Sequence, residues 1–469
     1  MIVNLYRTFP EERYIGMYQG TLPTLLIRDP EIIKRITVKE FDHFPNHRSF
    51  IPDDVEPLWS KNLVFLKDMA WRDMRSTLSP SFTSNKMKII FSLITDCASI
   101  YVDYFSKQGK KINIELKDTT TRFANDVIAS AAFGITCDSI NEKENDFYMM
   151  GEKLIIALRR NPRFFLYSMA PKLCQVLKLK LFPAETLNFF VKLIEKTIHI
   201  RETQAVIRPD MINQLLESRK GKTYADSSEE VIDTGFATVQ ESFISSSTKQ
   251  ILTNFDITAQ ALIFFFAGFD SVATVMSFLG HELAVNPDVQ QRLQDEIDDT
   301  LHKCNGNLTY EALMKMKYMD MVISEVLRKW PPGLITDRVC SKTFTIEPIR
   351  PHERSLTLNP GDLIFIPISG IHRDPQYYPN PDKFDPERFN DENKAKIKPY
   401  TYLPFGFGPR SCIGSRFGIL EIKIIFFYIL SKFNLVATEK TQIPIVLDKK
   451  NLSILGENGM WVALKRRNK

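Results

Sequence analysis

The sequence predicts a mainly helical α+β protein that folds as one unit, with smaller β-sheets contributed by the two ends of the chain. Two patterns support this prediction. Apolar residues recur at helical spacing from Trp71 to about Leu216, and again in the stretches that end at Trp330. Beyond Pro331-Pro332-Gly333, the next ~130 residues carry most of the proline-containing turns, and the segments around 359–362 and 373–389 are too rich in proline for helix interiors.

The individual elements follow in chain order. Apolar and polar residues alternate around Tyr14–Tyr18 and Thr24–Pro30, which predicts two strands, and Asp29-Pro30 marks a turn or the start of a helix. The segment 219–250 is polar and rich in Ser, Thr and Gly, so we expect a surface connection within one domain. Near the other end, a turn at 359–362 precedes an apolar run, and the apolar stretch 415–430 predicts a helix.

Composition excludes several classes of protein. The chain has 469 residues, is 44% hydrophobic and 25% charged, and carries 61 Lys and Arg against 56 Asp and Glu. These values exclude a disordered, collagen-like or purely coiled-coil chain, and a net charge of +5 is too small to indicate nucleic-acid binding. The six cysteines contain no CxxC pair, which argues against a disulfide framework or a structural zinc site and favours a reducing compartment.

The first sixteen residues contain four charged side chains and no apolar core, so they do not predict a signal peptide. The most apolar window elsewhere, Ala261–Phe269, runs directly into Asp270. Because a spanning helix needs about 20 apolar residues, the sequence as written does not predict a membrane crossing.

The most specific local signal is the segment FGFGPRSCIG, from Phe405 to Gly414. Its glycines allow a tight loop, and Cys412 lies just ahead of the predicted helix. A cysteine at a helix N-terminus, with Arg410 nearby, has its thiolate form favoured. Such a thiolate is a nucleophile or a metal ligand, although a buried structural cysteine beside a glycine turn is an equally good explanation from these residues alone.

This loop resembles the haem-binding loop of cytochrome P-450, the haem-thiolate monooxygenases, through Phe405, Gly408, Arg410, Cys412 and Gly414. Other motifs of that family occur in the expected order: Trp71 with Arg75, Ala267–Ser271, Glu325 with Arg328, and Pro386–Phe389. The style of the sequence is similar to the microsomal animal type, in particular the insect detoxification clan. The resemblance implies one domain over residues 1–469, folded as a triangular helical prism around one haem b.

The resemblance also implies which residues bind the haem. Cys412 is the expected axial ligand of the iron. Haem carries two carboxylates, which are costly to bury unless they are paired. The residues expected to contact the haem are Trp71, Arg75, Ala267, Arg338, Phe405, Arg410, Cys412 and Gly414. For each arginine alone, the competing explanation is a solvated surface side chain.

Glu325 and Arg328 lie three residues apart on a predicted helix with an apolar face. An exposed pair of this kind contributes only about 0.3–0.5 kcal/mol. The resemblance instead implies a buried network with Arg388 that supports the Cys412 loop from behind. That role is structural and not catalytic.

Asp270 interrupts an apolar helical run, which is an expensive place for a carboxylate without a function. With the hydroxyl of Ser271, it is expected to relay protons to bound oxygen. The family usually has Thr where this chain has Ser271, and serine lacks the methyl group that restricts the rotamer. The resemblance therefore does not predict how tightly oxygen reduction is coupled to substrate oxygenation. The alternative is a helix kinked by a polar pair.

The implied reaction inserts one atom of O2 into an apolar substrate, a xenobiotic or an endogenous lipid or terpenoid. No segment resembles a flavin or nicotinamide site, so electrons are expected from NADPH through a cytochrome reductase, with cytochrome b5 as a second candidate partner. The expected docking residues are Arg72, Lys86, Lys88, Arg416 and Lys423. The alternatives are an isomerase or dehydratase acting on peroxides, a haem carrier or sensor, and a haem-free binding protein.

The substrate pocket is expected to include the loop 50–60, Phe265, Phe266, Phe269, the turn with Leu334 and Ile335, and Leu455. A Phe stripe at helical spacing is also what simple core packing produces. The stretch 163–194 mixes Phe and Leu with Lys, as a membrane-surface helix pair or an ordinary amphipathic helix does. We expect a location on the cytoplasmic face of the endoplasmic reticulum. The anchor helix and hinge of microsomal relatives are absent before Tyr14, which suggests an incomplete gene model, an alternative start or a shortened form.

Overall fold

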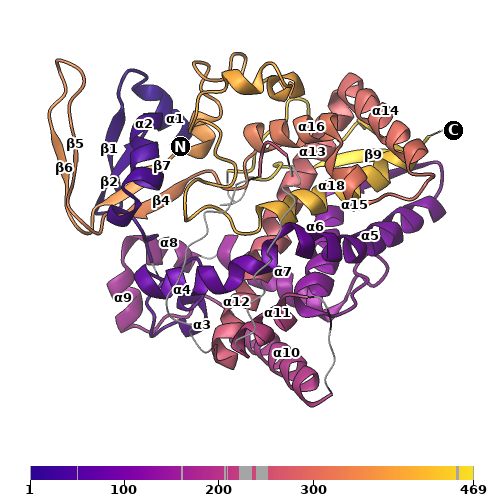
Figure 1. Cartoon of the computed structure of the whole chain (residues 1–469), viewed down its shortest axis with the longest axis horizontal. Helices are drawn as coiled ribbons and strands as arrows, with labels where there is room; N and C mark the ends of the chain where they lie inside the picture. The colour runs from indigo at the N-terminus through magenta and orange to yellow at the C-terminus, as the bar shows by residue number, and fades with distance from the viewer. Residues whose placement is uncertain are drawn as a thin grey trace.

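A computed structural model describes residues 2–49, 51–159, 162–204, 208, 210–220, 235–238, 252–449 and 454–467. Most of the predicted surface connection 219–250 lies outside these residues, as does Phe50 of the predicted pocket. The molecule has a triangular outline, with the long helix α10 along its narrow end (Figure 1).

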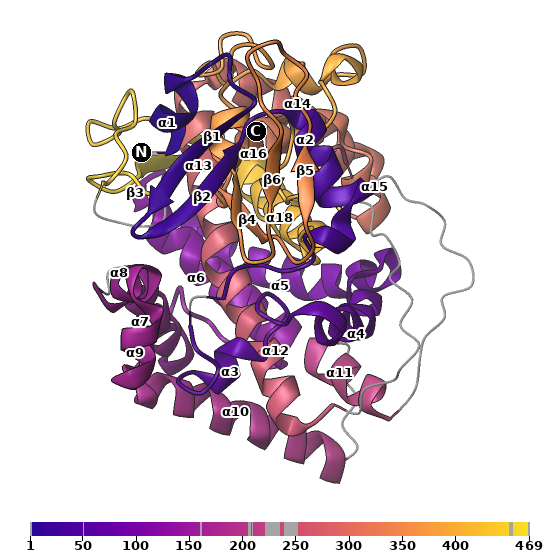
Figure 2. The same cartoon turned by 90° about the vertical axis from the view of Figure 1, so that its left-hand side faces the viewer.

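Helices make up most of the described chain and run through its whole length (Figures 1 and 2). The α-helices are α1 Ile2–Thr8, α2 Pro30–Lys34, α3 Pro57–Ser60, α4 Asp68–Leu78, α5 Ser84–Lys107, α6 Leu116–Ile128, α7 Asp146–Arg159, α8 Pro162–Met169, α9 Pro171–Val176, α10 Ala184–Thr203, α11 Met211–Arg219, α12 Asn254–Ala267, α13 Ala273–Val285, α14 Pro287–Lys303, α15 Tyr310–Met314, α16 Lys317–Lys329, α17 Ile368–Ile371 and α18 Ser415–Lys432. The π-helical turns are η1 Arg35–Lys39, η4 Ala129–Phe133 and η5 Gly268–Val272, and the 3₁₀ turns are η2 Phe41–His43, η3 Ser79–Phe82, η6 Pro386–Phe389 and η7 Lys394–Lys396.

Three small sheets join segments that are far apart in the sequence. The strands are β1 Tyr14–Gln19, β2 Leu22–Ile27, β3 Lys111–Glu115, β4 Thr336–Val339, β5 Phe344–Ile346, β6 Leu356–Leu358, β7 Leu363–Ile366, β8 Phe433–Val436 and β9 Trp461–Arg466. The strand orders are β1-β2-β7-β4, β3-β9-β8 and β5-β6. β2 pairs in parallel with β7, with Thr24 opposite Leu363, so the two ends of the chain share one sheet.

The predicted N-terminal elements are present with small shifts. The β1–β2 hairpin is antiparallel, with Tyr14 opposite Ile27. Asp29 then caps α2: its side chain accepts a hydrogen bond from the backbone N–H of Glu31, and Pro30 is the first helical residue. The helix predicted to start at Asp29-Pro30 is therefore present, and it starts there because Asp29 caps it and proline fits the first helical position.

The central helix runs without interruption from Asn254 to Val285, as α12, η5 and α13. Thr253 begins it with a reciprocal cap: its hydroxyl accepts from the N–H of Asp256, whose carboxylate accepts from the N–H of Thr253. Between α12 and α13, the π-helical turn η5 widens the helix at Gly268–Val272. This wide turn faces the loop that carries Cys412.

Two helices, Ser84–Lys107 and Asn254–Val285, are long and apolar enough to cross a membrane by length and composition alone. The sequence did not predict a crossing at Asn254–Val285, because Asp270 interrupts the apolar run there. The most apolar window of Asn254–Val285 is 78% buried within the protein, which is how a core helix of a folded domain behaves. The corresponding window of Ser84–Lys107 is 39% buried.

Candidate functional site

A cavity of about 220 Å³ lies between the central helix and the loop before α18. The cavity is apolar over most of its wall and cationic at one end. Its lining residues are His47, Leu63, Val64, Trp71, Arg75, Phe82, Ile128, Met211, Ile263, Phe264, Ala267, Gly268, Ser271, Val272, Phe405, Arg410, Ser411, Cys412, Ile413, Gly414, Phe417 and Gly418.

The Cys412 loop is shaped by its glycines and by one backbone hydrogen bond. Gly406 and Gly408 both have φ of +72°, a conformation that side chains other than glycine rarely adopt. A Cβ atom on Gly408 would lie 1.9 Å from the carbonyl oxygen of Thr37, so this glycine also permits a close backbone approach. The N–H of Cys412 donates to the carbonyl of Phe405 at 2.8 Å, which closes the loop.

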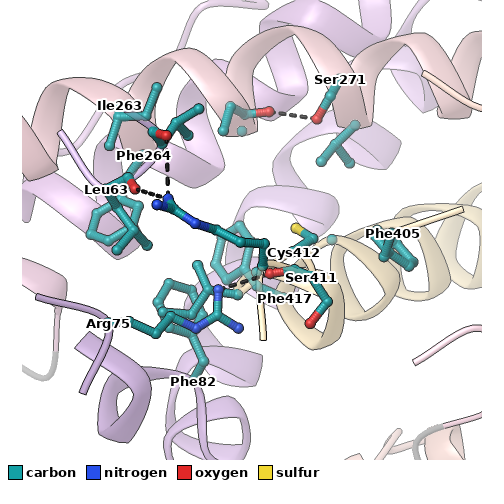
Figure 3. Close-up of a pocket in the computed structure, with 18 of the residues that line it drawn as sticks. Leu63, Arg75, Phe82, Ile263, Phe264, Ser271, Phe405, Ser411, Cys412 and Phe417 are labelled. Atoms are coloured by element: carbon teal, nitrogen blue, oxygen red, sulfur yellow. Dashed lines mark hydrogen bonds between the residues drawn. The ribbon is translucent and has the colours of Figure 1, made fainter. Parts of the chain in front are cut away.

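Cys412 lies at the cavity wall, just before the first residue of α18, and its side chain is exposed to the cavity space. Figure 3 shows its sulfur on one side of the cavity and Ser271 of the central helix on the facing side. The thiol is therefore presented to a space large enough for a ligand. The structural reading of this cysteine, a side chain buried beside a glycine turn, does not fit this placement.

The cationic end of the cavity is built by α4 and the Cys412 loop. Trp71 and Arg75 lie one turn apart on α4, and both are buried. Arg75 donates to the carbonyl of Ser411 at 2.8 Å (Figure 3). The guanidinium of Arg410 lies 4.0 Å from the centre of the Trp71 ring and donates to the carbonyl of Pro45 at 2.7 Å. The arginine heads are thus placed mainly by backbone carbonyls.

Arg410 and Arg338 are buried together, and they repel each other. Burial, with the positive charges of Arg338 and Arg75, lowers the pKa of Arg410 to about 8. Burial also lowers the pKa of Arg338 to about 10, although Asp337 opposes the shift. The Nε atom of Arg338 is buried without a hydrogen-bond partner among the described residues. This cluster therefore has an excess of buried positive charge, as a site for a ligand with carboxylate groups would have.

His47 lies at the cationic end of the cavity, and it was not predicted from the sequence. It lines the cavity, and its Nδ1 lies 3.0 Å from a carboxylate oxygen of Asp337. Burial and the charge of Arg338 lower the pKa of His47, which the Asp337 contact only partly offsets. No sequence motif includes this histidine. An antiparallel β-bridge between the neighbouring Asn46 and Val339, the last residue of β4, places it beside β4 and at the cavity.

The facing wall is the wide turn of the central helix. Ala267 and Gly268 present small side chains to the cavity, and the hydroxyl of Ser271 donates to the carbonyl of Ala267 at 2.5 Å. The Asp270 carboxylate does not line the cavity among the described residues. It accepts a hydrogen bond from Lys117 of α6 at 2.8 Å. Asp270 and Ser271 thus leave the helix in different directions.

The structure brings Glu325, Arg328 and Arg388 together behind the Cys412 loop. Glu325 and Arg328 are fully buried on α16, and two nitrogens of Arg328 donate to the two carboxylate oxygens at 2.6 and 2.8 Å. Arg388 approaches the same carboxylate at 3.5 Å. Arg328 also donates to the carbonyl of His372, whose ring accepts from the N–H of Leu403. The exposed-pair alternative is excluded by this burial.

Comparison with known proteins identifies the family. The family model described as "Cytochrome P450" matches residues 3–462. The chain is 44% identical to "Cytochrome P450 9e2" of Blattella germanica, over 99% of this chain and 87% of the relative. It is 39% identical to "Probable cytochrome P450 9f2" of Drosophila melanogaster and 36% identical to "Cytochrome P450 6k1" of Blattella germanica, covering 89% and 84% of those relatives.

The chain belongs to the cytochrome P450 family. It is therefore a monooxygenase that uses haem bound through a cysteine thiolate, together with O2, a redox partner and a small-molecule substrate. The predicted fold class and the predicted enzyme class are both confirmed. The cavity fits this cofactor, because it combines an accessible thiol, apolar walls and buried guanidinium groups at one end.

The side chains predicted for the substrate pocket lie away from the described lining of this cavity, and their contact with a substrate stays a prediction. Phe265 and Phe269 are buried in an aromatic cluster in which Phe265 packs on Phe190 at 4.7 Å and on Phe147 at 5.2 Å. Phe266 packs on Trp59 at 5.3 Å. Among the described residues the cavity lining includes none of these three, nor Leu334, Ile335 or Leu455. Helical spacing correctly predicted that these Phe residues lie on the central helix, but it did not show which face of that helix meets the cavity.

Besides Ala267, the residues of α12 that reach the cavity among the described residues are Ile263 and Phe264, and Phe82 of η3 is in edge contact with Phe264 at 5.6 Å. Met211, the first residue of α11, also lines it. Arg338, predicted to contact haem, does not line the cavity among the described residues, although it lies near enough to influence Arg410.

The predicted docking residues also need one correction. Lys423 of α18 has no exposed side-chain surface, and its Nζ lies 3.7 Å from Asp320 of α16, so it is not available to a partner protein. Arg72 forms an ion pair with Asp42 and Lys88 forms one with Glu311, while both keep exposed surface. Lys423 was a candidate because it is close in sequence to a haem-bearing helix, but α18 is buried on nearly all sides.

Proposed function

We propose that Cys412 is the thiolate ligand of the haem iron and that the reaction oxygenates an apolar organic compound with electrons from NADPH–cytochrome P450 reductase. The observation that carries the proposal is the placement of the thiol at the wall of an apolar cavity whose other end holds buried arginines. Insect P450 relatives over nearly the whole chain support the xenobiotic-metabolising type.

The residues divide the work of the site as follows. Cys412 would hold the iron, and Arg75, Arg410 and Trp71 would pair with the haem carboxylates. Arg338 would add positive charge behind them, and His47 a hydrogen bond at the cavity wall. When bound, haem with a thiolate ligand supplies the activation of O2 for insertion into the substrate. Ile263, Phe264, Leu63, Val64 and Phe82 exclude water from the reacting centre, because their side chains are apolar.

Proton delivery is assigned to the wide turn of the central helix. Ser271 presents a hydroxyl to the cavity, and its hydrogen bond to Ala267 fixes the position of the oxygen atom. Asp270 lies at the next position and is reached from the surface side of the helix, where its carboxylate is 16% exposed. Because the two side chains point in different directions, transfer of a proton from Asp270 to the Ser271 hydroxyl would need a bridging water or a rotation of one side chain.

The substrate proposed here is an uncharged apolar molecule. Apart from Ser271, the wall away from the arginines offers mainly hydrocarbon surface, so a charged substrate would lose its hydration without compensation. The peroxide isomerase and dehydratase alternative does not require an acid and an alcohol at this helix, and the presence of Asp270 and Ser271 favours monooxygenation.

A membrane-surface location is proposed for the α8–α9 region and the β1–β2 hairpin. Met169, Leu173, Val176 and Leu177 are exposed, with Val176 at 80%. Tyr18 in the hairpin is also exposed, and Gly20 lies against Met169. Together these apolar side chains support binding to the endoplasmic reticulum membrane.

The test is oxygen-dependent product formation by the full chain in vesicles with NADPH–cytochrome P450 reductase. Apolar insecticides, terpenoids, steroids and fatty acids are the probes, and Cys412→Ala is the negative control. The proposal expects products that carry one oxygen atom from O2 and that require NADPH. Conversion of an organic peroxide at the same rate without NADPH, and no labelled product with it, would support the isomerase instead.

A further inference from the structure

Lys117, the second residue of α6, reaches across to the wide turn Gly268–Val272. Its Nζ lies 2.8 Å from a carboxylate oxygen of Asp270, 3.1 Å from the Asp270 carbonyl oxygen and 2.9 Å from the hydroxyl oxygen of Thr274. The lysine and aspartate side chains are only 14% and 16% exposed. No motif marks this lysine, and it belongs neither to the cavity wall nor to the Cys412 loop.

The chemistry of this contact suits a π-helical turn. In such a turn the backbone carbonyls leave the regular helical pattern and need other donors. The Asp270 carbonyl accepts from the hydroxyl of Thr274 at 2.8 Å as well as from Lys117. A lysine ammonium has three donors and no acceptor, which matches the three oxygen atoms within its reach. The lysine therefore binds both the side chain and the backbone of Asp270.

The rest of α6 holds the same part of the central helix. The hydroxyl of Thr120 donates to the carbonyl of Ala273 at 2.9 Å and lies 2.9 Å from the hydroxyl of Ser277. At the other end of α6, a Cβ atom on Gly268 would lie 3.0 Å from the Ile128 side chain, so the helices are in close contact there. α6 thus packs along the wide turn, with Ile128 at the cavity and Lys117 as the charged contact away from the cavity lining.

We propose that Lys117 is a positioning residue for oxygen protonation: it holds the wide turn open and keeps the Asp270 carboxylate beside the helix position that carries Ser271. The proposal rests on the assignment of Asp270 and Ser271 to proton delivery. Lys117 touches neither substrate nor cofactor in this role. It acts through the backbone and side chain of Asp270. Loss of Lys117 should therefore make the turn more mobile and change how much of the reduced oxygen forms product and how much forms hydrogen peroxide.

The experiment compares Lys117→Met, Lys117→Arg and Thr274→Val in the haem-loaded full chain. Lys303→Met is the control, because Lys303 forms an exposed ion pair with Asp299 within α14, remote in sequence from α6 and the central helix. The first measurement is hydrogen exchange of the amides at 268–272 in the resting protein, which does not depend on turnover. Loss of a charged hydrogen bond to the turn should speed exchange about tenfold to a hundredfold in Lys117→Met.

Lys117→Arg retains the charge and should restore most of the protection, whereas Lys303→Met should leave it unchanged. Thr274→Val removes one of the three oxygen partners and should speed exchange at the same amides by a smaller factor. If Lys117→Met does not retain haem, the exchange rates measured in Thr274→Val test the proposal instead. Unchanged exchange at 268–272 in Thr274→Val and in any haem-loaded Lys117→Met would overturn the proposal.

The second measurement is product formed per O2 consumed, with and without Asp270→Asn. Lys117→Met should divert oxygen to hydrogen peroxide, and it should have no further effect in the Asp270→Asn background if it acts through Asp270. An equal effect in both backgrounds contradicts the assignment. If the wild-type protein oxygenates no substrate, the proposed function fails, while the exchange measurement still decides whether Lys117 holds the turn.

Discussion

Arg328 is the residue that joins most parts of the support behind the Cys412 loop. It is fully buried, and it binds Glu325, the carbonyl of His372 and the carbonyl of Pro381. Because Glu325 is equally buried, removal of the arginine would leave a carboxylate without its main partner. Such a change typically costs about 3–5 kcal/mol.

Arg328→Ala should therefore give little haem-loaded protein, measured as haem per polypeptide. The control is Arg292→Ala, which removes an ion pair with Glu387 on the surface and should cost at most about 1 kcal/mol. Normal haem content in Arg328→Ala would show that the network is not needed to support the loop.

Two glycines of the Cys412 loop offer a matched comparison at the same scale. Gly406 and Gly408 share a φ of +72°, so alanine should be strained equally at both, by about 1–2 kcal/mol. Only at Gly408 does the new Cβ atom meet a fixed obstacle, the carbonyl oxygen of Thr37 at 1.9 Å; at Gly406 the nearest atom is 3.8 Å away.

Gly408→Ala should lose haem and unfold at clearly lower temperature than Gly406→Ala, in haem titration and thermal unfolding of both variants. Equal behaviour of the two would mean that the loop moves away from Thr37 at little cost. Gly408 belongs to the motif from which the loop was predicted, but its contact with the π-helical turn η1 was not readable from the sequence.

At the scale of elements, the short helices α8 and α9 carry the proposed membrane surface. Val176 and Leu177 are exposed at 80% and 56%. Burial of one such side chain in an apolar phase contributes roughly 1.5–3 kcal/mol. Val176→Glu should therefore weaken binding to phospholipid vesicles by at least about tenfold, measured by co-sedimentation.

Ile443→Glu is the matched control, because Ile443 is 66% exposed and lies in the loop between β8 and β9, outside α8 and α9. Its substitution should leave vesicle binding unchanged. Equal loss in both variants would indicate a general effect of added negative charge and would remove the support for this surface.

At the level of elements, the sequence predicted which segments form helices and strands but not which face of a buried helix meets the cavity. Alternation and helical spacing located β1, β2 and the central helix, because these patterns reflect one buried face. On α12, however, every residue from Asp256 to Phe265 is buried, so the sequence has no polar face from which the cavity side could be inferred. Phe265 and Phe264 are adjacent and equally apolar, yet only Phe264 lines the cavity among the described residues.

For the whole molecule, the order of the motifs was sufficient to predict one haem domain, because each motif fixes a contact between distant segments. Glu325 with Arg388 and the Cys412 loop with α4 are such contacts. His47 and Lys117 could not be predicted in the same way. Their functions depend on neighbours that only the packed chain supplies, Asp337 and Arg338 for the histidine and the wide turn for the lysine.

The central claim for the whole molecule is that Cys412 binds the iron of a haem held in this cavity. The most direct measurement is the absorption spectrum of the reduced carbon monoxide complex of wild-type protein, Cys412→His and Cys304→Ser. Cys304 follows α14, away from the cavity lining, so its variant tests for a general effect of losing a thiol. We expect the thiolate-type spectrum for wild type and for Cys304→Ser. In Cys412→His, we expect loss of that spectrum together with loss of monooxygenation. Persistence of that spectrum in Cys412→His would contradict the assignment of the ligand.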